Sequence, residues 1–202
     1  MQRYEFFLIF VPYYNRNMEQ NVIQQNMWNL AGRAGLVLGA VSTAYLFLTQ
    51  WLAMNEVPAL MLMFISMLLW AGKFAACIFL MTIYMKRFSS ENPEADRRAV
   101  FRAGMAIALL SALVYSAFAF ANIAFIYPDY LTEQISMMME QLAPMLDSNT
   151  LNEMEKTMQN LPQMTFFSNL IYCFIYGTFL SSIISRLISR QAASTGYKPE
   201  EN

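Results

Sequence analysis

Four stretches of this chain are long and apolar enough to cross a lipid bilayer, and they constrain the fold more than any other feature. They cover about residues 34–54, 59–85, 103–127 and 165–185, and a single charged residue, Lys73, interrupts them. Because hydrocarbon contains no water, each segment must satisfy its own backbone hydrogen bonds, which a helix of about 20 residues does. The sequence therefore predicts an all-α, polytopic membrane protein with four transmembrane helices.

The remaining segments divide the chain into an arm, a membrane domain and a tail. Residues 1–29 are predicted to form a cytoplasmic or interfacial arm, of which residues 1–17 have the character of an upstream-start artefact. Residues 30–190 make up the membrane domain, and residues 191–202 are expected to be a disordered cytoplasmic tail.

The segment between the third and fourth spans, residues 128–164, is predicted to form an amphipathic helical cap over the outer mouth of the bundle. Apolar residues recur in it at helical spacing, with acidic residues between them. Asp129 fits a helix N-cap, and Thr150 with Glu153 fits a capping box at the start of a second helix. Pro162 is expected to end that second helix.

Basic residues are distributed unevenly between the two sides of the predicted membrane domain. Eleven of the 13 Lys and Arg residues lie on the side of the two termini and the loop between spans two and three. The outer segment carries Lys156 alone. Since Lys and Arg accumulate on the cytoplasmic side, we predict that both termini are cytoplasmic.

Small residues four positions apart predict where the helices touch, because they let helix backbones approach closely. These pairs and triplets are Gly35 and Gly39; Gly72 and Ala76; Ala108, Ala112 and Ser116; and Gly177, Ser181 and Ser185. Four such faces favour a compact bundle, although the first pair is equally compatible with a homo-oligomer contact.

Lys73 is the feature that most needs an explanation. A cation at the centre of a span costs about 2.5–3.5 kcal/mol on insertion scales, and Lys73 lies about 18 Å along the helix from Met85. The spans contain no Asp, Glu or His that could pair with it. Neutral acceptors at similar depth are Ser42, Thr43, Tyr45, Tyr115, Tyr172 and Tyr176.

Three interpretations of Lys73 remain open at this point. The residue is hydrogen-bonded inside the bundle, or it meets an acidic group of a partner protein or a lipid phosphate. In the third interpretation it binds an anionic substrate or carries a proton in transport. All three make Lys73 and the neutral acceptors around it a candidate intramembrane polar site.

The chain carries no recognisable catalytic, metal-binding or cofactor-binding motif. It has no His, and its two cysteines, Cys77 and Cys173, fall in apolar stretches and are expected to pack as small hydrophobic residues. A formal net charge of −1 gives no reason to expect a nucleic-acid partner. We therefore predict a protein that is not an enzyme and has no catalytic residue, metal or cofactor.

Five stretches carry a resemblance to a known family. They are residues 31–47 (AGRAGLVLGAVSTAYLF), 70–81 (WAGKFAACIFLM), 91–118, 126–130 (IYPDY) and 166–190. Across residues 18–190 the chain resembles a family of four-span bacterial inner-membrane proteins that is defined only as a domain of unknown function. The resemblance implies a multi-pass protein of the bacterial inner membrane. It also implies a polyprenyl-phosphate glycosyltransferase as a membrane partner, because genes of that family often lie next to genes that encode such enzymes.

The function that the sequence favours is that of a non-enzymatic accessory or scaffold subunit of an envelope complex, which the resemblance connects with lipid-linked sugars. The alternative is a small transporter or lipid-handling protein with an intramembrane site at Lys73. The first function requires a membrane-protein partner or a homo-oligomer, whereas the second requires a polar cavity that reaches Lys73.

Overall fold

The computed structural model describes residues 3–55, 58–93, 95–128 and 160–195, with residues 136–137, 139–140, 147 and 153 between the last two ranges. Four long helices dominate it: α1 (Arg3–Met54), α2 (Ala59–Glu91), α3 (Arg97–Ala121) and α6 (Leu161–Thr195). A short π-helical turn, η1 (Asn122–Ile126), continues α3. Each long helix contains a segment long and apolar enough to cross a membrane, which confirms the predicted all-α fold with four spans.

The helices extend beyond the predicted spans, because hydropathy marks only the part of a helix that lies in hydrocarbon. The predicted arm, residues 1–29, supplies the N-terminal part of α1, and residues 191–195 of the predicted tail belong to α6. Pro162 was expected to end a cap helix, but it lies in the first turn of α6, where its missing N–H would have no partner in any case. Most of the predicted cap, including Asp129 and Thr150, lies outside the described residues.

The loop between α2 and α3 is short and is fixed by side-chain hydrogen bonds. Asn92 caps the end of α2 through its Nδ2 atom, which donates to the Phe88 carbonyl at 3.0 Å. Asn26 of α1 donates to Asn92 Oδ1 at 3.2 Å, which connects α1 to this loop. Asp96 then caps α3 by accepting a hydrogen bond from the Ala99 N–H at 2.8 Å.

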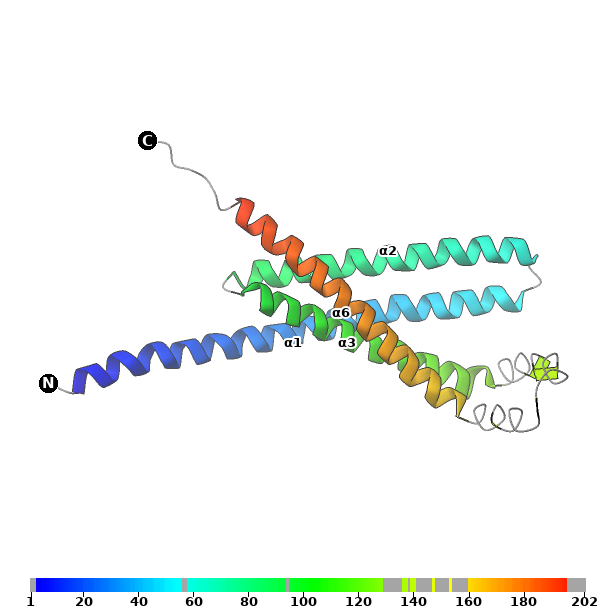
Figure 1. Ribbon diagram of the computed structural model, residues 1–202, viewed down its shortest axis with the longest axis horizontal. Helices are drawn as coiled ribbons and strands as arrows, with labels where there is room; N and C mark the ends of the chain where they lie inside the picture. The colour runs from blue at the N-terminus through cyan, green and yellow to red at the C-terminus, as the bar shows by residue number, and fades with distance from the viewer. Residues whose placement is uncertain are drawn as a thin grey trace.

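Helix α3 is the centre of the bundle and packs against both α1 and α6 (Figure 1). Helix α2 runs antiparallel to α1 and makes only slight contact with α3 and α6. The N-terminus and the C-terminal end of α6 lie at the same end of the molecule as the short loop after α2 (Figure 1). This arrangement is the one that an even number of antiparallel spans produces.

Three of the four predicted small-residue faces lie at helix contacts. A Cβ atom added at Gly35 would lie 2.6 Å from Leu110 Cβ, and one at Gly177 would lie 2.5 Å from Ala108 Cβ. Between α3 and α6, Ser181 Oγ also donates a hydrogen bond of 2.9 Å to the Phe101 carbonyl. The prediction for Gly72 is wrong, because no described atom lies within 4 Å of the place its Cβ would take.

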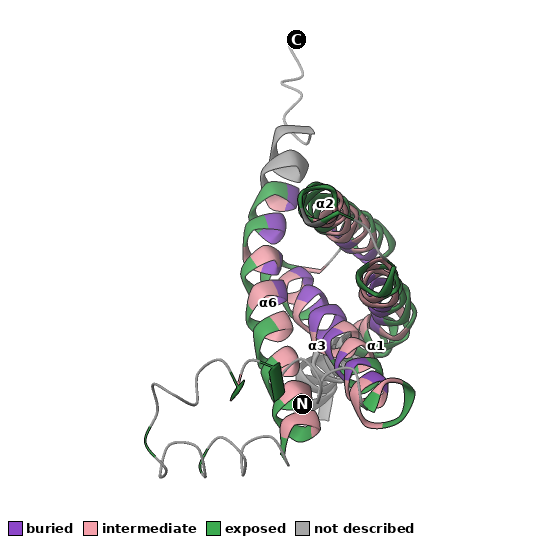
Figure 2. Cartoon of the chain, turned by 90° about the vertical axis from the view of Figure 1, so that its right-hand side faces the viewer, coloured by how far each residue is buried: buried purple, intermediate pink, exposed green. Residues whose placement is uncertain are grey.

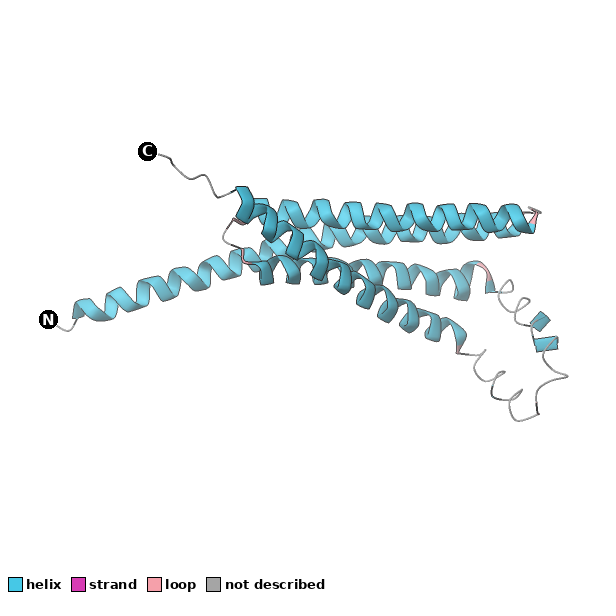
Figure 3. Cartoon of the chain, turned by 45° about the horizontal axis from the view of Figure 1, so that its top comes forward, coloured by secondary structure: helices cyan, strands magenta, loops and turns pink. Residues whose placement is uncertain are grey.

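The buried apolar core occupies the half of the bundle next to the loop between α2 and α3. Viewed along the bundle, the buried residues lie on the sides of the helices that face one another (Figure 2). Among the described residues of α2, the buried side chains are Met81, Met85 and Phe88, all in its second half. In its first half, large apolar residues such as Leu60 and Leu68 are 75% exposed and form an apolar surface. At that end, the pair α1 and α2 diverges from the pair α3 and α6 (Figure 3).

The C-terminal ends of α1 and α3 remain joined by one polar contact. Asn122, at the start of the π-helical turn, donates from Nδ2 to Gln50 Oε1 at 2.6 Å. The turn itself is closed by the Tyr127 N–H, which donates to the Asn122 carbonyl at 2.9 Å. The divergence at this end therefore leaves α1 and α3 connected and separates α2 from α6.

Candidate functional site

Lys73 lies in the middle of α2, 14 residues after Ala59, which is about 21 Å along the helix axis. Its side chain is half-buried, and no hydrogen bond or ion pair joins it to any part of the chain that the structure describes. Its ammonium nitrogen instead lies 4.8 Å from the ring centroid of Tyr45 in α1 and 4.8 Å from that of Tyr115 in α3. Two cation–π contacts, each worth about 0.5–2 kcal/mol, thus offset part of the cost of the buried charge.

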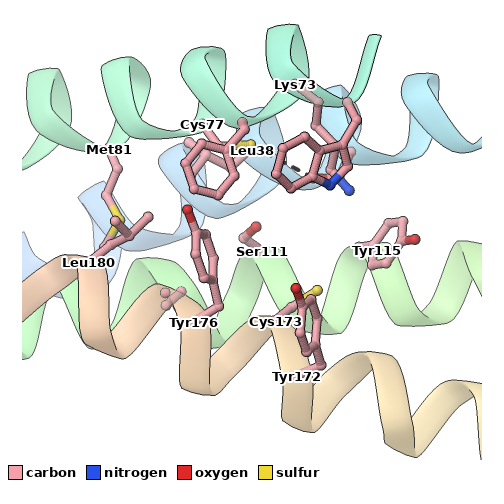
Figure 4. A pocket seen from close by; sticks show the side chains of 15 residues that line it. Leu38, Lys73, Cys77, Met81, Ser111, Tyr115, Tyr172, Cys173, Tyr176 and Leu180 are labelled. Carbon is pink, nitrogen blue, oxygen red and sulfur yellow. Dashed lines mark hydrogen bonds between the residues drawn. The ribbon is translucent and has the colours of Figure 1, made fainter. Parts of the chain in front are cut away.

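A cavity of about 120 Å³ adjoins Lys73 and is lined by residues from all four long helices (Figure 4). Its floor is formed by apolar residues at the edge of the core, including Leu38, Met81 and Leu180. Its polar lining consists of Ser42, Lys73, Cys77, Ser111, Tyr115, Tyr172, Cys173 and Tyr176. Lys73 is therefore the single formal charge among the described lining residues.

The structure brings most of the predicted site residues to this cavity, but in roles that differ from those expected. Tyr45 and Tyr115 were expected to offer their hydroxyl groups to Lys73, yet they present their ring faces. Thr43 is not a lining residue, because its hydroxyl donates back to the Gly39 carbonyl at 2.9 Å. Ser42 does line the cavity, and its Oγ lies 4.0 Å from Cys77 Sγ.

The two remaining predicted residues, Tyr172 and Tyr176, lie on the side of the cavity formed by α6. Tyr172 is 71% exposed, so it lies at the edge of the cavity. The Tyr176 hydroxyl is buried and has no hydrogen-bond partner among the described residues. That hydroxyl is consequently available to a bound molecule.

Both cysteines are free thiols that line the cavity, a location that the sequence analysis did not predict. Helical spacing was the signal that could have located them. Cys77 lies four residues after Lys73 on the same face of α2, and Cys173 lies three residues before Tyr176 on α6. Ser111, four residues before Tyr115 on α3, follows from the same argument.

An aromatic rim marks where the cavity opens between α2 and α6. Trp70 and Phe74 of α2 stack with ring centroids 5.4 Å apart, and Phe74 also meets Tyr176 at 5.2 Å. Trp70 lines the cavity and is nevertheless 55% exposed, and Tyr172 of α6 also lines the cavity. Since α2 and α6 make only slight contact and both Trp70 and Tyr172 are more than half exposed, this rim lies at the surface of the bundle between the two helices.

The chemistry of the lining is that of a binding site. It combines one ammonium group with hydroxyl and thiol groups, and its described residues include no carboxylate or imidazole that could act as a base. In the described part of the chain, no cluster of His, Cys, Asp or Glu residues could hold a metal ion. The arrangement suits a molecule that is held by a positive charge and by hydrogen-bond donors.

The fold defines an integral membrane protein with a four-helix bundle, and the cavity is a polar candidate site between its helices. The family described as Protein of unknown function (DUF4199) matches residues 33–190, and the chain belongs to it. This confirms the predicted resemblance to a four-span family of unknown function, although the match begins later than residue 18. No curated protein and no solved structure matches the chain.

Proposed function

We propose that this protein binds a membrane-borne molecule in the cavity beside Lys73 and thereby acts in lipid handling, without catalysing a reaction. The sequence alone ranked this function second. The observation that carries it is the polar cavity, lined by all four helices, that reaches the Lys73 ammonium group, which has no ion-pair partner among the described residues.

The size and position of the cavity support this function. A cavity of about 120 Å³ is close to the engineered cavity of about 150 Å³ that binds benzene, so it has room for a small ligand group. Its lateral rim gives a molecule dissolved in the bilayer a direct route to it. A charged residue kept in a span despite its insertion cost is by default a functional residue.

A cavity-filling variant tests the proposal. Ser111 is half-buried and lines the cavity, whereas Leu113 on the same helix is 39% exposed and lies outside the lining. We expect purified wild-type protein and Leu113→Phe to retain a lipid-sized bound mass in native mass spectrometry, and Ser111→Phe to lose it. Equal retention by Ser111→Phe and wild type would show that the cavity is not the binding site.

We also propose, as a second role, that the protein is an accessory or scaffold subunit of an envelope complex that handles lipid-linked sugars. The supporting observation is the surface around Gly72 on α2, where no described atom lies within 4 Å of the place that a Cβ atom would take, so that a second helix could approach closely. A polyprenyl-phosphate glycosyltransferase or a second copy of the chain would be the partner. Co-purification from mild detergent tests this, and a Gly72→Leu variant that retains every partner would count against the surface.

The proposed location is the bacterial inner membrane, with both termini in the cytoplasm. The exposed basic residues Lys86, Arg98 and Arg186 support this orientation, because they belong to the end of α2, the start of α3 and the C-terminal part of α6. These three segments lie at the same end of the bundle (Figure 1). A cysteine introduced at Ser90 should react with an impermeant maleimide only after the inner membrane is opened. Labelling in intact spheroplasts would contradict the orientation.

A further inference from the structure

We infer that the ligand is an anionic amphiphile, whose acidic group lies beside Lys73 and whose apolar chain leaves the cavity between α2 and α6. This inference rests on the proposed lipid-handling function and adds the charge of the ligand and the direction in which it lies. It is carried by the charge, the free donors and the rim of the cavity.

The charge of the site is uncompensated. Lys73 contributes the single formal charge among the described lining residues, and no described carboxylate pairs with it. Its contacts with Tyr45 and Tyr115 attract the ammonium group to ring faces but leave its net charge in place. An ammonium group has three N–H donors, and an acidic group can accept from them where a ring face cannot.

A second donor is available from the opposite side of the cavity. The buried Tyr176 hydroxyl of α6 has no partner in the described chain, and Ser111 of α3 also lines the cavity. Figure 4 shows Tyr176 rising from α6 toward α2, on which Lys73 lies. Donors from several helices would thus surround one acidic group, such as a phosphate or a carboxylate.

The size of the cavity and the nature of its rim indicate an amphiphile. A volume of about 120 Å³ has room for an acidic group but not for a lipid chain as well. The rim residues Trp70, Phe74 and Tyr172 are apolar or aromatic and are 55%, 37% and 71% exposed. An apolar chain that passes over this rim would remain in contact with apolar side chains and bilayer hydrocarbon.

Trp70 provides a reporter for the experiment because it lies at the rim. With Trp28 and Trp51 changed to Phe, Trp70 is the one remaining tryptophan of the chain. The protein is reconstituted in dioleoyl-phosphatidylcholine vesicles that contain a small fraction of lipid with brominated chains, which quenches tryptophan on contact. The brominated lipid is phosphatidic acid in one series and phosphatidylcholine in the other.

From the quenching of Trp70, we expect phosphatidic acid to be enriched about tenfold over phosphatidylcholine at the rim. The reason is that hydrogen bonds to charged groups are stronger than those between neutral groups. Lys73→Gln should abolish the enrichment, whereas Lys86→Gln, which removes an exposed charge at the end of α2, should keep it. Equal enrichment of both lipids, insensitive to Lys73→Gln, would overturn the inference and leave the lipid-binding function intact.

Two further outcomes separate the inference from the function on which it rests. Quenching by both lipids at the level of their mole fraction would refute lipid binding itself and the inference with it. Release of bound brominated phosphatidic acid by excess inorganic phosphate would assign the site to a water-borne anion. It would overturn the inference that the ligand is an amphiphile. Persistence of the quenching in phosphate supports an acidic lipid.

Discussion

The contact between α1 and α3 predicts that two glycines of α1, three residues apart, respond in opposite ways to the same substitution. A Cβ atom at Gly35 would lie 2.6 Å from Leu110 Cβ and 3.1 Å from the Ser111 backbone nitrogen. A Cβ atom at Gly32 meets no described atom within 4 Å. Gly32→Ala should therefore be neutral or stabilising, whereas Gly35→Ala should destabilise the bundle.

The magnitude follows from the geometry. Carbon atoms in ordinary contact are about 3.5–4.0 Å apart, so Gly35→Ala requires α1 and α3 to separate by roughly 1 Å. Neither a Cβ atom nor a backbone atom can rotate away, and overpacking of this kind costs about 1–3 kcal/mol. Replacing Gly by Ala in a helix contributes up to about 1 kcal/mol of stability at either position. The two variants should thus differ in free energy of unfolding by about 2 kcal/mol.

The measurement is thermal unfolding in detergent micelles, followed by circular dichroism. For a chain of this length a difference of about 2 kcal/mol corresponds to roughly 4–8 °C in Tm. Gly39→Ala, whose Cβ would lie 2.6 Å from Val114 Cβ, should behave like Gly35→Ala, and Gly72→Ala like Gly32→Ala. If all four variants unfold at the same temperature, α1 and α3 do not pack at this distance and the reasoning is refuted.

Three further predictions address a cap, a polar contact and the site. Asp96→Ala removes the N-cap of α3 and should lower Tm by about 2–4 °C, since such caps contribute about 1 kcal/mol; an unchanged Tm would contradict it. A double-mutant cycle of Asn122→Ala and Gln50→Ala should give a coupling of about 0.6 kcal/mol in thermal unfolding, and additive effects would argue against the contact. Cys173 should react about tenfold faster with an anionic than with a cationic methanethiosulfonate, as measured by intact mass, because Lys73 is positively charged. Lys73→Gln should remove that preference, and a preference that persists would have another source.

The architecture could be predicted from the sequence because a membrane span is a local property. The length and hydropathy of each stretch determine that it crosses the bilayer as a helix, without reference to any other part of the chain. The small residues at Gly35 and Gly177 also gave two of the helix contacts correctly. Helix ends were predicted less well, because α2 and α3 continue past the apolar stretches that hydropathy detects.

The site could be predicted only in part, because depth is a local property and the direction in which a side chain points is not. The sequence placed Lys73 and Tyr115 at the same depth, and they do meet. It could not show that the ring face of Tyr115, rather than its hydroxyl, would receive the ammonium group. It also could not separate Ser42, which lines the cavity, from its neighbour Thr43, which bonds to its own helix.

The cavity exists because one helix packs differently from the other three. Helices α1 and α6 each approach α3 through small residues such as Gly39, Gly104 and Gly177, so these two contacts leave little space. Helix α2 meets them through large side chains, including Trp70 and Met81, and it makes the fewest contacts of the four. The rigid part of the site therefore comes from three closely packed helices and its charge from the fourth, so a ligand that binds Lys73 would also hold α2 against the bundle.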